Sequence, residues 1–137
     1  MSLILDSSVT LARVCSSETT PAIVEVFDRL IEGGARVPAL WRLEVANALE
    51  MRARQRRIEP EFRDAALRNL ALLPIRMDPE TDRQAWGVTL HLAEKHRLTV
   101  YGAAYLELAL RRSLPLATLD AELRSAAAIE GVPLLGL

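Results

Sequence analysis

The feature that most constrains the fold is the alternation of very short apolar runs with longer helix-forming segments. Each run ends at a polar residue, a glycine or a proline, which predicts a short buried strand. Short strands separated by helices require crossover connections, which predict a mostly parallel sheet covered by helices on both faces. The five expected strands are residues 3–5, 36–37, 75–77, 115–118 and 132–135.

The segments between these strands carry the start and stop signals of helices. Thr20 followed by Pro21 is a typical cap and first-turn proline, and the pair Gly33-Gly34 ends that helix. The segment from 102 to 112 is apolar on nearly every face, which predicts a buried helix. The expected helices are residues 21–32, 40–57, 60–72, 78–96, 102–112 and 121–130, so helix should far outweigh strand.

Length and composition limit the possible classes of protein. The chain has 137 residues, which predicts one domain over residues 1–137, and 17 basic against 18 acidic side chains exclude a polybasic nucleic-acid binder. A single cysteine and two histidines exclude an internal disulfide and a Cys/His zinc cluster. No run is long enough to span a membrane, and Asp6 interrupts the first apolar run, so no signal peptide is expected. We therefore expect a cytoplasmic protein.

Acidic residues stand where a parallel sheet collects ligands. Asp6 follows the first expected strand and Asp120 follows the fourth, at the carboxyl edge of the sheet. Either could simply cap the helix that follows; if the two strands are neighbours, both carboxylates converge and favour a hard cation such as Mg²⁺ or Mn²⁺. Glu44 is a third candidate, with Asn47 on the same side of its helix, although Glu44 could instead face solvent.

Other polar and aromatic residues favour structural interpretations. The arginine cluster over residues 52–57 is either a solvated helix end or a contact to RNA phosphates or an acidic partner segment. Cys15 is expected to be an inert, half-buried thiol, and Trp41 and Trp86 to be packing residues rather than base-stacking ones. The histidines, His91 and His96, are expected on the surface of a polar helix.

Four segments together resemble the PIN-domain proteins, and more narrowly the VapC-type ribonuclease toxins of bacterial toxin–antitoxin pairs. They occur in the family's order and cover most of the chain: residues 5–9 (LDSSV), 38–49 (PALWRLEVANAL), 98–109 (LTVYGAAYLELA) and 116–123 (LATLDAEL). The resemblance implies a three-layer α/β/α fold and a metal-dependent endoribonuclease that uses Mg²⁺ or Mn²⁺. It also implies an RNA substrate, a homodimer and a VapB-like antitoxin partner, for which the apolar helices at 21–31 and 61–72 are candidate docking surfaces.

The resemblance assigns roles residue by residue. By position, Asp6, Glu44 and Asp120 correspond to metal-binding and catalytic acids of the family, and Ser7, Asn47 and Thr118 to polar residues beside them. The chain departs from the pattern at Gly102, where family members usually carry aspartate. Either an engineered inactivation or natural degeneration would explain this glycine.

Gly102 affects the expected activity, and it leaves open a second class of function, that of a binding module without catalysis. A missing acid should weaken the metal site and leave activity low or absent. The alternative is a catalytically dead PIN-like module that binds antitoxin or RNA. A phosphotransfer domain is excluded, because the only lysine, Lys95, lies in a helix and Ser8 stands where a dehalogenase-type site needs its second acid.

Overall fold

The computed structural model describes residues 1–137, and its centre is a five-stranded sheet. Every pair of neighbouring strands is parallel, in the order β3-β2-β1-β4-β5. The predicted strand count and direction are therefore confirmed; the bounds of β1 and β3 are as predicted, and those of the other three strands differ by one or two residues. The strands are β1 (Leu3–Leu5), β2 (Ala35–Val37), β3 (Ile75–Met77), β4 (Leu116–Ala117) and β5 (Leu134–Leu135).

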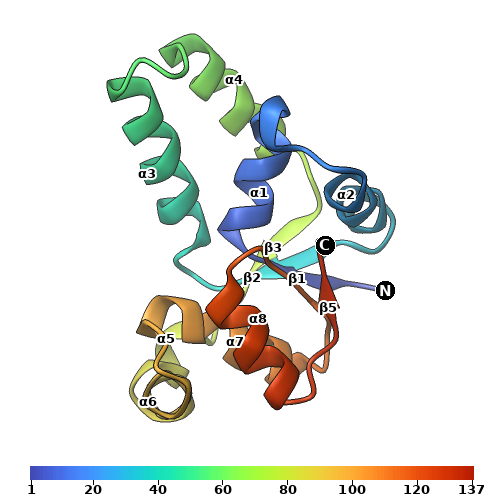
Figure 1. Ribbon diagram of the computed structural model, residues 1–137, viewed down its shortest axis with the longest axis vertical. Helices are drawn as coiled ribbons and strands as arrows, with labels where there is room; N and C mark the ends of the chain where they lie inside the picture. Colours follow the sequence, from blue (N-terminus) through green and yellow to red (C-terminus); the bar gives the residue numbers. More distant parts are fainter.

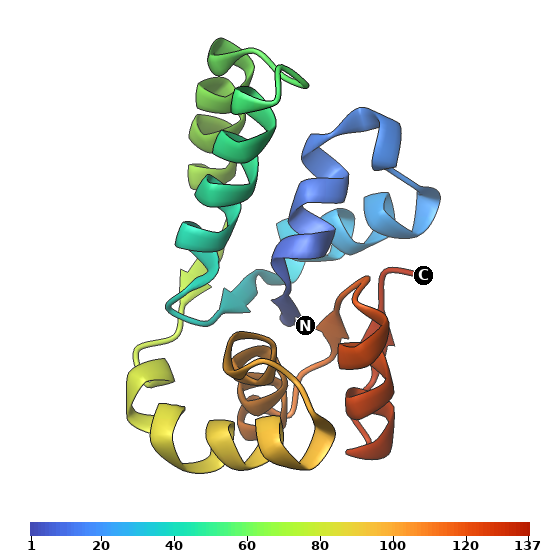
Figure 2. The ribbon, with the colours of Figure 1, turned by 60° about the vertical axis from the view of Figure 1, so that its left-hand side comes forward.

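Helices form one layer on each side of this sheet (Figures 1 and 2). One layer contains α1 (Ser7–Val14), η1 (Ser16–Glu18), α2 (Pro21–Gly33), α3 (Trp41–Arg54) and α4 (Pro60–Ala71). The other contains α5 (Thr81–Gln84), η2 (Ala85–Thr89), α6 (Leu90–His96), α7 (Val100–Arg112) and α8 (Ala121–Ile129). This is the expected three-layer α/β/α architecture, rich in helix. No helix is both long and apolar enough to cross a lipid bilayer.

The central strand explains why the acidic segments meet. All three residues of β1 are fully buried, as expected for a parallel strand covered on both faces. Its neighbours are β2 on one side and β4 on the other, with Leu5 in register with Ala117. Parallel strands end at the same edge of a sheet, so the residues that follow β1 and β4 lie side by side.

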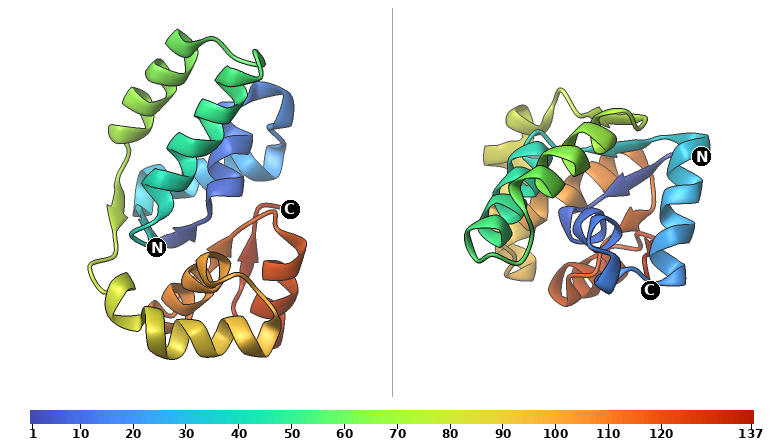
Figure 3. Two further views of the ribbon diagram at one scale, coloured as in Figure 1. Left: turned by 90° about the vertical axis from the view of Figure 1, so that its left-hand side faces the viewer. Right: turned by 90° about the horizontal axis from the view of Figure 1, so that it is seen from above.

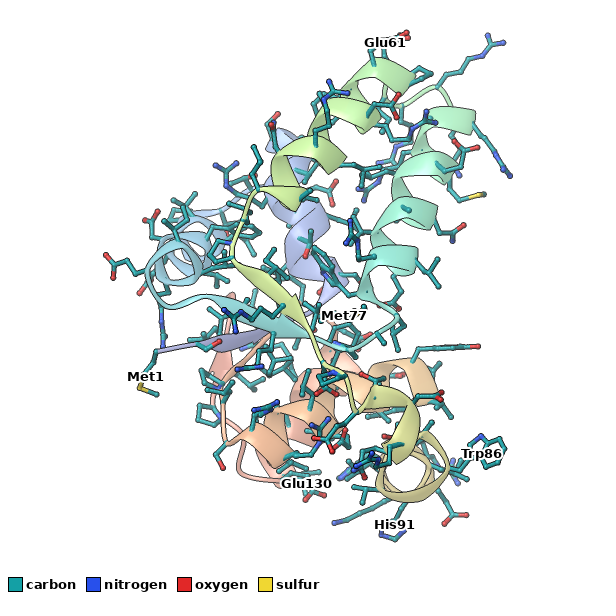
Figure 4. All side chains as sticks on the ribbon, turned by 180° about the vertical axis from the view of Figure 1, so that it is seen from behind. Met1, Glu61, Met77, Trp86, His91 and Glu130 are labelled. Carbon is teal, nitrogen blue, oxygen red and sulfur yellow. The ribbon has the colours of Figure 1, made fainter.

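The structure corrects the prediction of one continuous helix over residues 78–96. Gly87, with φ −112° and ψ −107°, is not helical, and the segment divides into α5, the π-helical turn η2 and α6. Glycine is a poor helix former, so a break here costs little. Trp86, the residue before Gly87, is 93% exposed, and Figure 4 shows its side chain clear of the ribbon. The prediction that Trp86 is a packing residue is wrong for this single chain.

An ion-pair cluster joins the end of the edge strand β3 to helix α7. Asp78 directly follows β3, and its side chain is fully buried. Arg111 of α7 donates to both carboxylate oxygens of Asp78, at 2.7 and 3.0 Å, and to both oxygens of Glu107, at 2.8 and 3.0 Å. Burial alone would raise the pKa of Asp78, and the Arg111 guanidinium overcomes this and lowers it.

Helices α3 and α4 form a hairpin that projects away from the sheet (Figure 3). Only Leu70 of α4 is buried, so this helix packs less tightly than its neighbours. Apolar grooves lie on both of its sides: one of about 290 Å³ between the hairpin and the strands β2 and β3, and one of about 370 Å³ between α4 and α2. The second groove is lined by the two helices that the sequence singled out as candidate docking surfaces.

Candidate active site

Asp6 lies at the carboxyl end of the central strand and is 7% exposed. It precedes α1, but its side chain does not cap that helix. Instead its Oδ2 atom accepts hydrogen bonds from Ser8 at 2.6 Å and from Thr118 at 2.8 Å. Burial raises the pKa of this carboxyl group, against the opposing effect of those two hydroxyls. The helix-cap alternative for Asp6 therefore does not apply.

The two hydroxyls around Asp6 also accept hydrogen bonds from the backbone. Ser8 Oγ accepts from the amide of Leu119 at 3.0 Å, and Thr118 Oγ1 accepts from the amide of Asp120 at 3.1 Å. Because an ionised carboxylate can only accept, each hydroxyl directs its own proton at Asp6 and accepts from the amide through a lone pair. The turn after β1 and the turn after β4 are thus joined through one carboxylate oxygen, which fixes its position.

Glu44 brings a second carboxylate to this edge from the first turn of α3. Its Oε1 atom accepts a hydrogen bond from the phenol of Tyr105 at 2.5 Å. Burial raises the pKa of Glu44, and the nearby charge of Asp6 raises it further, while hydrogen bonds from Tyr105 and Ser7 lower it. Two acids whose charges act on each other in this way form a region of negative potential.

Tyr105 is one of two residues of the site that the sequence did not point to. It lies in α7, three residues after Gly102, and is 1% exposed. Burial and the charges of Asp6 and Glu44 raise its pKa far above the ordinary value, so the phenol stays protonated and acts as a donor. Ser8 was missed as well. The available signals were a tyrosine hydroxyl inside an otherwise apolar helix and a second serine after Asp6.

Of the remaining predicted residues, two interact with this acid pair and two are exposed. Thr118 contacts Asp6 directly, and Ser7 lowers the pKa of both Glu44 and Tyr105 through hydrogen bonding. Asp120 is exposed, and its carboxylate accepts from the amide of Leu123 at 3.0 Å, which makes it the cap of α8. Asn47 is exposed on α3.

Gly102 occupies the third position of α7. Its amide donates to the Thr99 hydroxyl at 3.0 Å, which caps the helix. A Cβ atom built at this position would be 3.4 Å from that hydroxyl, an ordinary contact, so a side chain fits here. The helix therefore begins at Val100, two residues earlier than predicted, and its first turn carries no acidic residue.

The site offers a divalent cation few protein ligands. Nowhere in the chain do three or more His, Cys, Asp or Glu side chains gather where they could hold a metal ion. The pair Asp6 and Glu44 does fit the way in which Mg²⁺ is usually held, by one or two carboxylates and several waters. The residues thus fit a weak, largely hydrated site rather than a closed cage.

Other residues singled out in the sequence take structural roles. Trp41 is buried and its indole donates to Thr10 at 3.0 Å, as a packing residue does, and Cys15 is half-buried beside Arg52. His96 is not the surface residue expected: its side chain is 6% exposed and Nε2 lies 2.6 Å from Glu130 Oε2. His91 is exposed (Figure 4).

Three solved structures resemble the chain in fold. PAE2754 from Pyrobaculum aerophilum is 23% identical with a TM-score of 0.68, over 92% of this chain and 84% of that one. FitAcB from Neisseria gonorrhoeae is 17% identical with a TM-score of 0.67, over 98% and 96%. VapBC2 from Rickettsia felis, bound to a DNA fragment from the promoter, is 10% identical with a TM-score of 0.62, over 98% and 97%. A comparison with curated protein sequences finds no match.

The family model for the PIN domain matches residues 3–129. That range contains the edge of the sheet with Asp6, Glu44 and Thr118. It also contains Gly102, in the first turn of helix α7. The fold, the carboxylates and the sequence match agree, and the chain belongs to the PIN domain family.

Proposed function

We propose that this chain is a VapC-like endoribonuclease toxin of a toxin–antitoxin pair, which hydrolyses RNA phosphodiester bonds and is impaired by Gly102. The observation that carries the proposal is the pairing of Asp6 and Glu44 at the carboxyl edge of the sheet. Asp6 is fixed by Ser8 and Thr118, and Glu44 by Tyr105. Two buried or half-buried acids with no arginine or lysine bonded to them favour a divalent cation as the compensating charge.

Asp6 and Glu44 would hold Mg²⁺ or Mn²⁺ together with water. When bound, such an ion lowers the pKa of an attacking water and stabilises the charge on phosphate oxygens. Asp6 supplies a fixed oxygen, because both hydroxyls around it are themselves held by the backbone. Glu44 is closer to solvent and can orient the water. Asp120 caps α8 through its Oδ1 atom, so only its Oδ2 atom would be left to contribute.

The missing side chain at Gly102 explains why the proposed activity is impaired. The family's usual aspartate would stand in the first turn of α7, one helical turn before Tyr105, which binds Glu44. Loss of a residue that supports a metal ligand typically lowers affinity or activity by about 10–100-fold. Loss of an acid that itself binds the ion should cost at least as much, so the site is expected to need millimolar Mg²⁺ or Mn²⁺.

A groove between α2 and α4 is the proposed binding site for a VapB-like antitoxin. Its volume is about 370 Å³, and its lining is mostly apolar, with Val24, Phe27 and Ile31 from α2 and Phe62 from α4. Charged residues of opposite sign, Arg13 and Asp28, are also part of the lining. An amphipathic helix recognises such a groove by burying its apolar face. The partner is expected to occupy it with a helix of that kind.

The proposed homodimer would use the segment around η2. Trp86 is 93% exposed, and Val88 and Leu90 on the same segment are about half exposed. Exposed large apolar side chains that lie together mark interaction surfaces, and tryptophan is enriched at the energetic centre of such interfaces. A second copy of the chain would cover them.

A second candidate function is a PIN-like module that binds antitoxin or RNA without cutting. The observation in its favour is that Asp120 is engaged in capping α8 and position 102 has no carboxylate. In this case the fold and the groove between α2 and α4 are retained, and the acid pair has no catalytic role. The two candidates differ in whether an acid at position 102 restores cleavage.

The deciding experiment compares the chain with its Gly102→Asp and Gly102→Asn variants. Each protein is incubated with a mixed RNA pool that includes structured tRNAs, once with Mn²⁺ and once with EDTA. We expect cleavage only with Mn²⁺ and mainly in Gly102→Asp, because asparagine has the same size without the charge. A further Asp6→Asn change in the Gly102→Asp protein should abolish it. If no variant cuts RNA, the binding module is the better description.

A further inference from the structure

We infer that Tyr105 is a positioning residue of the proposed metal site, where its phenol holds the Glu44 carboxylate beside Asp6. This inference rests on the proposed function and adds to it a residue outside the acidic set. The direct evidence is the hydrogen bond from the Tyr105 hydroxyl to Glu44 Oε1 at 2.5 Å, which joins residues 61 positions apart in the chain.

The phenol is well suited to fix a carboxylate because the tyrosine itself does not move. Tyr105 is 1% exposed, and its neighbours Ala103 and Leu106 on α7 are fully buried. Glu44, in contrast, is only half-buried on the first turn of α3 and has a long side chain. A ligand of this kind holds its geometry only if a rigid neighbour supports it. Tyr105 is that neighbour.

The charge of the site explains why a neutral donor stands at this position. Asp6 and Glu44 repel each other, so Glu44 alone would turn toward solvent. A lysine or arginine would hold Glu44 in place but would cancel the negative charge that attracts a cation. The tyrosine hydroxyl holds the carboxylate and leaves its charge intact. The Ser7 hydroxyl of α1 also lowers the pKa of Glu44.

Tyr105 also lies close in the helix to Gly102, the position at which this chain departs from the family's usual aspartate. Gly102 and Tyr105 are three residues apart in α7, so they lie on the same side of the helix. One turn of this helix therefore has two positions directed at the acid pair: position 102, where the family usually has an aspartate, and Tyr105, whose phenol binds Glu44. The chain has lost the first contribution and kept the second.

The test measures Mn²⁺ affinity, by electron paramagnetic resonance of the free ion, in the wild-type protein and in Tyr105→Phe. We expect the affinity to fall about 10–100-fold, the usual cost of losing the partner of a ligand. Tyr101→Phe is the matched control: it removes the same atom from the same helix at a site that is 63% exposed, and it should bind as the wild type does. Urea unfolding in EDTA verifies that all variants are folded.

A double-mutant cycle separates an action through Glu44 from a general structural effect. In a Glu44→Gln background, Tyr105→Phe should have little further effect on Mn²⁺ affinity, because the group it holds has lost its charge. An undiminished loss in that background would overturn the inference, as would wild-type affinity in Tyr105→Phe alone. If the wild-type protein binds no Mn²⁺ at all, the proposed metal site fails together with the inference.

Discussion

The Thr118 hydroxyl donates to Asp6 Oδ2 at 2.8 Å, across 112 positions of the chain. This bond joins the ends of the neighbouring strands β4 and β1, and the same hydroxyl accepts from the Asp120 amide at 3.1 Å. Thr118 is fully buried, so neither bond can be replaced by water without opening the structure. The residue that orients the first acid of the site is therefore also a structural link between two loops.

Thr118→Val should destabilise the protein by about 1–3 kcal/mol, because it removes one of the two hydroxyl donors of the buried Asp6 carboxylate and leaves the Asp120 amide without its acceptor. Valine has nearly the same shape, so packing is preserved. The measurement is urea unfolding in EDTA. Ser125→Ala, which removes a hydroxyl from an exposed site on α8, is the control and should change the stability by less than about 0.5 kcal/mol. Equal stability of Thr118→Val and wild type would contradict the link.

The fold could be predicted largely from the sequence, because its determinants are local. The apolar runs at 3–5 and 75–77 coincide with β1 and β3, and the signals Thr20-Pro21 and Gly33-Gly34 coincide with the ends of α2. The break at Gly87 was missed, since a single glycine within a helical pattern is often tolerated. The pair Gly33-Gly34 signals a helix end, whereas nothing around the single Gly87 in the sequence indicates that it interrupts the helix.

The site was less predictable, because hydrogen-bond partners are set by tertiary contacts. Asp6 and Glu44 were identified by their place after a strand and within a helix, and Thr118 was expected beside them only through the family resemblance. Tyr105, which holds Glu44 from far away in the chain, was not expected at all. Asp120 illustrates the limit: its position at the end of β4 was predicted, whereas the direction of its carboxylate depends on the turn that follows.

Asp6→Asn should make the metal-free protein more stable near neutral pH. Burial raises the folded-state pKa of Asp6, so the folded state favours the protonated form and loses stability as the pH rises through that pKa. Asparagine stays neutral and can still accept from Ser8 and Thr118. The difference in melting temperature between variant and wild type, measured in EDTA, should be positive at pH 7 and shrink toward zero as the pH falls below the ordinary value of 3.8. A difference independent of pH would contradict this.

Substitutions at Gly102 should separate helix propensity from charge. Gly102→Ala is expected to stabilise the protein by about 0.5–1 kcal/mol, because its Cβ has room and alanine is the better helix former. In EDTA, Gly102→Asp should be less stable than Gly102→Ala through repulsion by the acid pair, and Mn²⁺ should close this gap. Thermal melts with and without Mn²⁺ measure both effects. An aspartate variant that is clearly more stable than alanine in EDTA would refute the repulsion.

Trp86→Ala should weaken self-association without weakening the fold of the single chain. The side chain is 93% exposed, so its removal should change the unfolding free energy of the monomer by less than about 0.5 kcal/mol. If Trp86 lies at the centre of a dimer interface, its removal should lower the free energy of association by about 2 kcal/mol or more. Sedimentation equilibrium measures the association, with Ile129→Ala, an exposed apolar residue on α8, as the control. Association unchanged by Trp86→Ala would place the dimer contact elsewhere.

Arg111→Met should be among the most destabilising changes on the surface of α7, because Arg111 neutralises the fully buried Asp78 carboxylate. Removal of one partner from a buried ion pair typically costs about 3–5 kcal/mol, since the remaining charge has no compensation. Arg112→Met is a close control: it is the next residue of the helix, is exposed, and forms no ion pair, so its effect should stay within about 0.5 kcal/mol. Both are measured by urea unfolding at neutral pH.

In Arg111→Met the pKa of Asp78 should rise, because burial then acts unopposed by the guanidinium. The stability deficit should therefore narrow as the solution is acidified and Asp78 becomes neutral. Equal losses in the two variants would show that the cluster does not anchor β3 to α7.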